Sequence, residues 1–67
     1  MIRNNFKELL EKHDKTAYAV ARDLLLPVPT LYALRNNEYS MPRAYILGLL
    51  CSYFDIEVED LLVIVVE

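Results

Sequence analysis

Residues 16–36, TAYAVARDLLLPVPTLYALRN, decide the fold, because they carry the signals for two short helices joined by a turn. Thr16 is a good helix N-cap, and small and medium apolar residues follow it at the spacing of one helix face. They are Ala17, Val20, Ala21 and Leu24. Pro27 and Pro29 then fit only a turn or a first helical turn, since proline lacks the backbone N–H. We therefore predict one helix over about 17–24 and a second that begins near Pro29.

The second of these helices has a clear inner face and a clear end. Leu31 and Leu34 lie three residues apart and are expected to point inward. Asn36 and Asn37 tolerate the left-handed conformation that often ends a helix. A loop over 38–41 is expected to follow.

Upstream of this stretch, apolar residues draw one stripe at the spacings i, i+4, i+7, i+8 and i+11. They are Ile2, Phe6, Leu9, Leu10 and His13. Charged residues fill the other positions, so we predict a first helix that includes Ile2.

Downstream, Pro42 precedes an apolar segment that predicts a helix over about 43–54, which Asp55 closes. A short helical turn is expected over 58–62. The β-branched run at 63–66 prefers an extended strand.

The joint spacing of these positions resembles the Cro and phage-repressor (XRE-type) helix-turn-helix family. The residues in the two-helix core that carry the resemblance are Thr16, Val20, Ala21, Leu26, Thr30, Leu31, Leu34 and Asn36. The pattern continues through Pro42, Leu47, Leu50, Cys51, Phe54, Ile56, Asp60, Leu61 and Leu62. The resemblance implies an all-α, five-helix, lambda-repressor-like domain with a short C-terminal extended tail, in which residues 1–67 form a single domain.

The resemblance also implies a DNA-binding face. In that family the second helix of the core lies in the major groove and the first crosses the phosphate backbone. The positions that would face bases or nearby phosphates are Pro27, Val28, Pro29, Thr30, Tyr32 and Ala33. Those expected near phosphates around the two helix ends are Thr16, Ala17, Arg35, Asn36, Asn37, Tyr39 and Arg43.

The chain departs from the family pattern where base recognition is expected. Ala17 stands where the family usually has glutamine, and Leu25 stands where it usually has the turn glycine. Bidentate readout of adenine or guanine needs Asn, Gln, Arg or Lys, whereas the readout positions hold Val28, Pro29 and Ala33. Side chains of this kind can touch thymine methyl groups and little else.

Composition limits the function classes. The net charge is −3, so any DNA-binding face must be local rather than spread over the surface. The lone histidine and the absence of a glycine-rich phosphate loop argue against an enzyme. The single Cys51 has no metal-ligand spacing, and no cofactor is expected. Charged residues interrupt the N-terminus, which therefore lacks the apolar core of a signal peptide, and no apolar stretch is long enough to span a membrane, so we expect a protein of the reducing cytoplasm.

A homodimer is expected because the predicted 43–54 helix is apolar around almost its whole circumference. With Leu47, Leu50, Cys51 and Phe54 facing inward, the residues left for a subunit contact are Ile46, Leu49 and Tyr53. The extended tail adds Leu62, Val63, Ile64, Val65 and Val66, which we expect to pair with the same strand of a two-fold partner. The alternative is that the tail folds back on its own helices.

Two functional hypotheses follow. The first is a repressor-like transcriptional regulator that binds double-stranded DNA as a homodimer on a short inverted repeat. The alternative is a helix-turn-helix scaffold without DNA readout, which serves as a protein-interaction or dimerisation module. The apolar readout positions and the negative charge favour the alternative.

Overall fold

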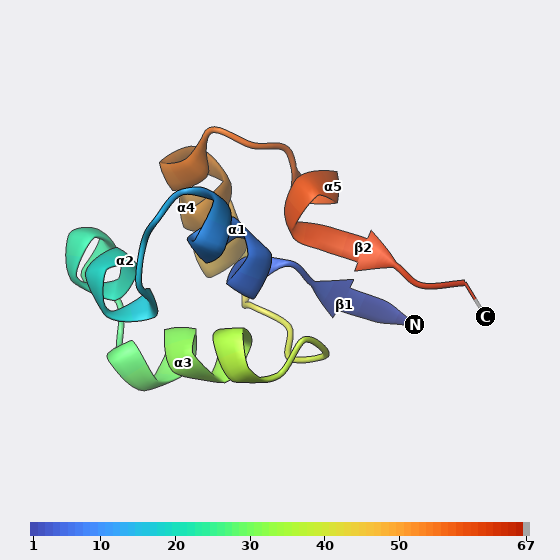
Figure 1. Cartoon of the computed structure of the whole chain (residues 1–67), viewed down its shortest axis with the longest axis horizontal. Helices are drawn as coiled ribbons and strands as arrows, with labels where there is room; N and C mark the ends of the chain where they lie inside the picture. Colours follow the sequence, from blue (N-terminus) through green and yellow to red (C-terminus); the bar gives the residue numbers. More distant parts are fainter. Residues whose placement is uncertain (67) are drawn as a thin grey trace.

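The computed structural model describes residues 1–66 and contains five helices and two short strands within them (Figure 1). Along the chain these are β1 (Ile2–Asn4), α1 (Phe6–Lys12), α2 (Ala17–Leu24), α3 (Val28–Asn36), α4 (Ala44–Phe54), α5 (Val58–Leu61) and β2 (Leu62–Ile64). The predicted five-helix fold with an extended C-terminal segment is confirmed. None of the helices in this part of the chain combines the length and the apolar character that crossing a bilayer requires.

The first helix of the predicted core, α2, has the expected bounds because its start and its end are fixed by local bonds. The Thr16 hydroxyl accepts a hydrogen bond of 3.1 Å from the Ala19 N–H, as an N-cap does. At the other end Leu25 adopts the left-handed conformation with φ 57°, and the next residue, Leu26, donates its N–H to the Ala21 carbonyl. This bond and the left-handed conformation of Leu25 turn the chain from α2 into α3.

Leu25 offers a test of the turn, because a left-handed conformation costs an L-residue roughly 1–2 kcal/mol. Its side chain is 91% exposed, so replacing it loses little packing. We expect Leu25→Gly to stabilise the fold by about 1 kcal/mol, which raises the melting temperature of a domain of this size by roughly 4–8 °C. Leu25→Ala is the control: it keeps the Cβ atom, and an equal gain there would contradict the backbone explanation.

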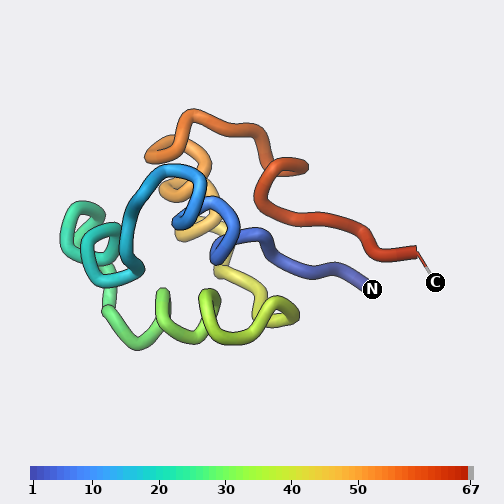
Figure 2. The backbone as a smooth tube through the Cα atoms, in the orientation of Figure 1, coloured from blue at the N-terminus to red at the C-terminus, as the bar shows by residue number. Residues whose placement is uncertain are grey.

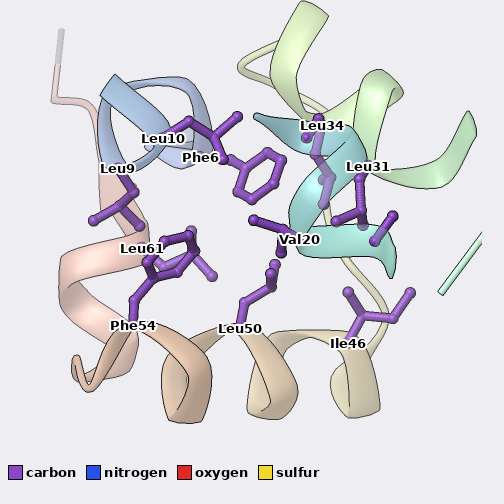
Figure 3. Packing of buried hydrophobic residues seen from close by; sticks show 12 residues of the cluster. Phe6, Leu9, Leu10, Val20, Leu31, Leu34, Ile46, Leu50, Phe54 and Leu61 are labelled. Carbon is purple, nitrogen blue, oxygen red and sulfur yellow. The ribbon is translucent and has the colours of Figure 1, made fainter. Parts of the chain in front are cut away.

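The core forms where the five helices meet (Figure 3). Figure 3 shows Phe6 near the centre of the cluster, between Val20 and Leu34, with Leu50 and Phe54 approaching from α4. The buried apolar side chains are Phe6, Leu9, Leu10, Ala17, Val20, Ala21, Leu31, Leu34, Ile46, Leu50, Phe54 and Leu61. The inward direction predicted for Leu31 and Leu34 is confirmed.

The predicted start of the first helix is wrong. Ile2 lies in β1 and is half exposed, and α1 begins only at Phe6. The side chain of Asn4 explains the boundary, because its Oδ1 atom accepts the Phe6 N–H at 3.1 Å. Asparagine favours such local bonds over a helix interior.

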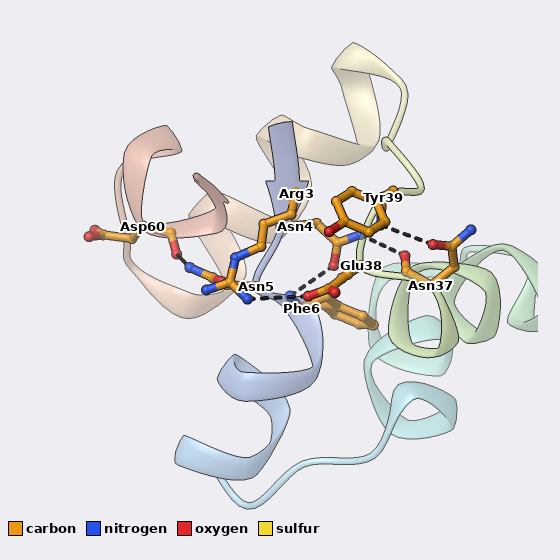
Figure 4. A network of polar contacts seen from close by, with 8 residues as sticks. All are labelled: Arg3, Asn4, Asn5, Phe6, Asn37, Glu38, Tyr39 and Asp60. Carbon is orange, nitrogen blue, oxygen red and sulfur yellow. Dashed lines mark hydrogen bonds and ion pairs between the residues drawn. The ribbon is translucent and has the colours of Figure 1, made fainter. Parts of the chain in front are cut away.

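Asn4 also ties β1 to the loop that follows α3 (Figure 4). Its side chain is 2% exposed, and its amide donates to the carbonyls of Asn37 and Ser40 at 3.2 and 2.6 Å. Nearby, the Asn4 N–H donates to the Glu38 carbonyl, and the Arg3 guanidinium pairs with the Glu38 carboxylate at 3.2 Å. One buried side chain therefore holds three backbone groups from two distant segments.

The end of α3 also differs from the prediction. Asn37 is extended, with φ −134°, and no residue from 26 to 54 has a positive φ. The Asn37 side chain instead accepts the Tyr39 N–H at 3.0 Å, and its carbonyl accepts the Ser40 N–H. A side-chain turn replaces the left-handed cap.

The α4 helix is rotated relative to the predicted orientation. Ile46 is 2% exposed and belongs to the core, so the expectation that it points outward is wrong. Leu49 is exposed as expected, whereas Tyr53 is partly buried and packs against the core. The Tyr53 hydroxyl donates a bond of 2.6 Å to Asp23 on α2 and thereby holds the pKa of Asp23 below its usual value, helped by the charges of Arg22 and Lys15 and opposed by desolvation.

The extended tail is paired within the chain. β2 runs antiparallel to β1, with Ile2 opposite Ile64 and Asn4 opposite Leu62, and a bond of 2.7 Å from the Val65 N–H to the Met1 carbonyl continues the ladder. Figure 2 shows the first and last segments side by side, extending away from the helices. The tail therefore pairs with the first strand of its own chain, and Leu62 at its start packs against the helical core.

Candidate nucleic-acid interface

The outward face of α3 is the starting point for the site, because α3 runs along one margin of the molecule (Figure 1). With Leu31 and Leu34 buried, the opposite face carries Pro29, Ala33 and Asn36 at the spacings i, i+4 and i+7. All three are exposed. We call these three residues the outer ridge.

The other predicted base-facing residues lie beside this ridge. Pro27 is exposed at the N-cap of α3. Val28 and Tyr32 are partly buried and pack against the core, and Thr30 is also partly buried. The structure thus places only part of the predicted readout set on the outward face.

A first hollow, of about 580 Å³, borders the ridge at Asn36 and lies beside the start of α2. We call it the α2-side hollow. Its lining residues are Lys7, Leu10, Glu11, Asp14, Lys15, Thr16, Ala17, Arg35 and Asn36. Three cations and two carboxylates therefore face one concavity together with the N-terminus of a helix, whose free N–H groups favour anions.

Arg35 is held in this hollow by its neighbours on α3. Its guanidinium lies over the Tyr32 ring, 4.4 Å from the centroid, and its Nε–H donates to the side-chain Oδ1 of Asn36 at 3.1 Å. Stacking on an aromatic face and a hydrogen bond restrict the side chain before any ligand arrives. These contacts hold Arg35 beside the outer ridge, where it lines the α2-side hollow.

The structure corrects one predicted contact. The Ala17 side chain is fully buried, so the expectation that it faces a phosphate is wrong. Ala17 lies in the first turn of α2, and its small side chain packs into the core there. What this position offers a ligand is the backbone N–H of a helix start.

A second hollow, of about 430 Å³, borders the ridge at Ala33, on the side of α4. We call it the α4-side hollow. Its lining residues are Thr30, Ala33, Leu34, Ser40, Met41, Pro42, Arg43, Tyr45 and Ile46. Arg43 stands at the N-cap of α4, and Tyr39 is exposed in the adjoining loop. The predicted residues Arg35 and Arg43 thus lie in different hollows that border the same ridge.

Charge is distributed unevenly along the chain. All seven lysines and arginines precede residue 44, whereas five of the ten acidic residues lie in 55–67. Within residues 1–66, ion pairs hold Arg3 to Glu38 and Arg22 to Asp23. Four other cations line the two hollows, so the negative net charge coexists with a local cationic face.

Two residues of this face, Lys7 and Tyr45, were missed by the sequence reasoning. Lys7 and Glu11 fall on one face of α1, at i and i+4, and this spacing could have grouped them. The position of this face beside α3 depends on tertiary packing, which the spacing does not reveal. Tyr45 is 60% exposed and escaped notice because the α4 segment is apolar on all sides.

Comparison with known proteins agrees with this geometry. Residues 5–67 match the family model of the Cro/C1-type HTH DNA-binding domain. A crystal structure from Bacteroides fragilis, described as a candidate DNA-binding protein, superposes with a TM-score of 0.80 at 19% identity and covers 92% of this chain and 98% of its own. No curated protein sequence matches the chain. Because the family match spans nearly the whole chain, the protein belongs to the Cro/C1-type helix-turn-helix DNA-binding domain family.

Proposed function

We propose that this DNA-binding domain is a repressor-like transcriptional regulator that inserts α3 into the major groove of duplex DNA. The observation that carries the proposal is the outer ridge, which projects between two hollows that each contain an arginine. A helix lying in the major groove has a phosphate backbone on either side of it. The ridge and its two cationic flanks have this arrangement.

Each flank has a defined role in the proposal. Lys7, Lys15 and Arg35, with the start of α2, approach the phosphates of one strand. Arg43, with the hydroxyls of Tyr39 and Tyr45, approaches the other strand. Contacts of this kind set register and orientation rather than sequence preference.

The acidic C-terminal residues support one orientation on DNA. Asp55, Glu57, Glu59 and Asp60 cluster around α5 without a lysine or arginine in 55–67. Repulsion between these carboxylates and phosphates disfavours docking through α5. Docking through α3 is left as the electrostatically favoured mode.

Salt dependence tests the proposal. Duplexes are first selected from a random pool, and their dissociation constants are then measured by fluorescence anisotropy between 50 and 200 mM salt. Four cations at phosphates predict a slope of log affinity against log salt of roughly −3 to −4 per protomer, at about 0.9 per contact, and twice that for a dimer with both protomers on DNA. No detectable duplex binding at the lowest salt would contradict the proposal and favour the scaffold hypothesis. The apolar side chains of Pro29 and Ala33 on the ridge are the observation that supports that hypothesis.

We further propose that the regulator is a homodimer and represses by excluding polymerase from an inverted repeat. Two exposed apolar surfaces support this: α4 at Leu49, and the tail at Ile64 and Val66. Val65 bonds to β1, so the peptide groups of Ile64 and Val66 point to the opposite edge of the strand. An exposed strand edge of this kind favours pairing with a second copy.

Sedimentation tests which surface forms the dimer. Leu49→Glu and Ile64→Glu each place a charge on one of the two surfaces, and the one at the interface is expected to yield monomers because a buried unpaired charge is strongly unfavourable. Val58→Glu is the matched control, since Val58 is exposed on α5 outside both surfaces. A wild-type protein that sediments as a monomer at micromolar concentration would contradict the dimer, and two dimeric variants would contradict both surfaces.

A further inference from the structure

We propose that the outer ridge selects duplexes by the C5 methyl groups of pyrimidines in the major groove. The inference rests on the proposed function, because it requires α3 to enter that groove. It assigns to Pro29 and Ala33 a specificity-determining role. The ligand class is double-stranded DNA that displays a methyl group at this face.

The chemistry of the ridge is the first step. Pro29 and Ala33 are exposed, lie one helical turn apart and present only hydrocarbon to the groove. Pro29 also has no backbone N–H to donate. Among the major-groove edges of the four standard bases, the C5 methyl of thymine is the apolar feature. Contact with that methyl is the favourable interaction that hydrocarbon side chains make there.

Two of the polar neighbours are already engaged away from Pro29 and Ala33. Arg35 stacks on Tyr32 and lines the α2-side hollow, and the side-chain Oδ1 of Asn36 accepts the Arg35 Nε–H. Bidentate reading of adenine by an asparagine needs both that oxygen and the amide N–H₂. The hydrogen-bonding pattern of α3 therefore disfavours the usual polar readout and leaves the methyl contact in place.

Base edges without a methyl group are disfavoured by the same surface. An apolar side chain that displaces water from a polar base edge leaves that edge without a hydrogen-bond partner. Thymine and 5-methylcytosine carry the same C5 methyl and differ at position 4, an acceptor in one and a donor in the other. Neither Pro29 nor Ala33 has a group that distinguishes the two, so both bases satisfy the proposed contact.

Base substitution tests the methyl group directly. In a duplex selected from a random pool, each thymine is replaced in turn by deoxyuridine, which removes only the methyl. We expect affinity to fall about three- to fivefold at each contacted position, from the burial of one methyl group. At those positions a C·G pair is also tested with and without a C5 methyl on cytosine. If methylation of cytosine restores the affinity, thymine and 5-methylcytosine can both supply the methyl group. If deoxyuridine lowers the affinity but methylation of cytosine does not restore it, only thymine supplies the methyl group.

A protein variant locates the contact. Ala33→Ser is close in size and adds a hydroxyl, so it is expected to bring the affinity ratio of thymine to deoxyuridine close to one at the base that faces residue 33. Ala44→Ser is the matched control, because Ala44 is exposed at the start of α4 and lies off the ridge. The coupling between variant and base is read as a double-mutant cycle.

The outcomes separate this inference from the proposed function. Salt-dependent duplex binding that is equal with thymine and deoxyuridine at every position overturns the methyl inference and leaves α3 docking intact. A methyl effect that persists unchanged in Ala33→Ser and in Pro29→Ser overturns the assignment to the ridge. No binding to any duplex overturns both.

Discussion

Arg35→Glu combined with Arg43→Glu is expected to weaken duplex binding by roughly 100-fold or more, because each hollow loses its arginine and gains a charge that repels phosphate. The two residues lie on opposite sides of the outer ridge, so the double variant affects both strands. The slope of log affinity against log salt should also become shallower by about two phosphate contacts per protomer. Fluorescence anisotropy on a selected duplex measures both quantities.

The single variants and one control make this result specific. Lys12→Glu changes the net charge as much as either single replacement does, and Lys12 is exposed and lines neither hollow. We expect it to reduce affinity far less than Arg35→Glu or Arg43→Glu. The helical circular dichroism signal and melting temperature report whether each variant is folded. Unchanged binding in a folded double variant would mean that the DNA face lies elsewhere.

Asn4→Leu is expected to cost about 3–4 kcal/mol of unfolding free energy. The replacement is similar in size, so the loss comes from hydrogen bonds rather than from a cavity. Leucine has no polar atoms to replace the Asn4 amide, so the Phe6 N–H and the carbonyls of Asn37 and Ser40 lose a hydrogen-bond partner. A chain of 67 residues has a total stability of roughly 3–10 kcal/mol, so a large part of it disappears. Urea unfolding followed by circular dichroism measures the change.

Asn5→Leu is the matched control for this variant. The Asn5 side chain donates one hydrogen bond, of 3.3 Å, to the Asp60 carbonyl near the surface. Its loss is expected to cost less than about 1 kcal/mol. Equal losses of unfolding free energy in the two variants would contradict a larger contribution from the hydrogen bonds of Asn4.

The parts of the fold that depend on neighbouring residues were predictable from the sequence. The bounds of α2 follow from the Thr16 cap and from an apolar stripe that begins directly after it. The end of α4 is another local feature, because Asp55 adopts the left-handed conformation there. Each depends on groups within a few residues, so no tertiary information was needed.

The missed strand β1 shows the opposite case. Ile2 stands four residues before Phe6 and so continues the apolar stripe of a helix in the sequence. What makes residues 2–4 a strand is β2, about 60 positions along the chain, together with the bonds that Asn4 makes to the loop after α3. A local pattern contains neither partner.

The orientation of α4 was unpredictable for a different reason. Apolar residues surround this helix, so the sequence alone does not identify the buried face. Ile46 enters the core and Tyr45 faces out, whereas Leu49 lies outside as expected.

At the candidate site, the sequence identified the arginines but not the surfaces to which they belong. Arg35 and Arg43 were chosen because they flank α3 in the chain, and each does line a hollow beside the outer ridge. Ala17 was chosen by position in the family pattern, and burial removes its side chain from the surface. The contribution of Lys7 depends on how α1 packs beside α3, which no short spacing encodes.

The pairing of β1 with β2 also constrains how the protein matures. Residues 2–4 are synthesised before the five helices, whereas their partners at 62–64 are synthesised only after all of them. Joining them closes a loop of about 60 residues, a slow kind of contact for a nascent chain. The bonds that Asn4 makes to the loop after α3 need no contact with β2, so the pairing of the two strands is the last of these contacts to become possible.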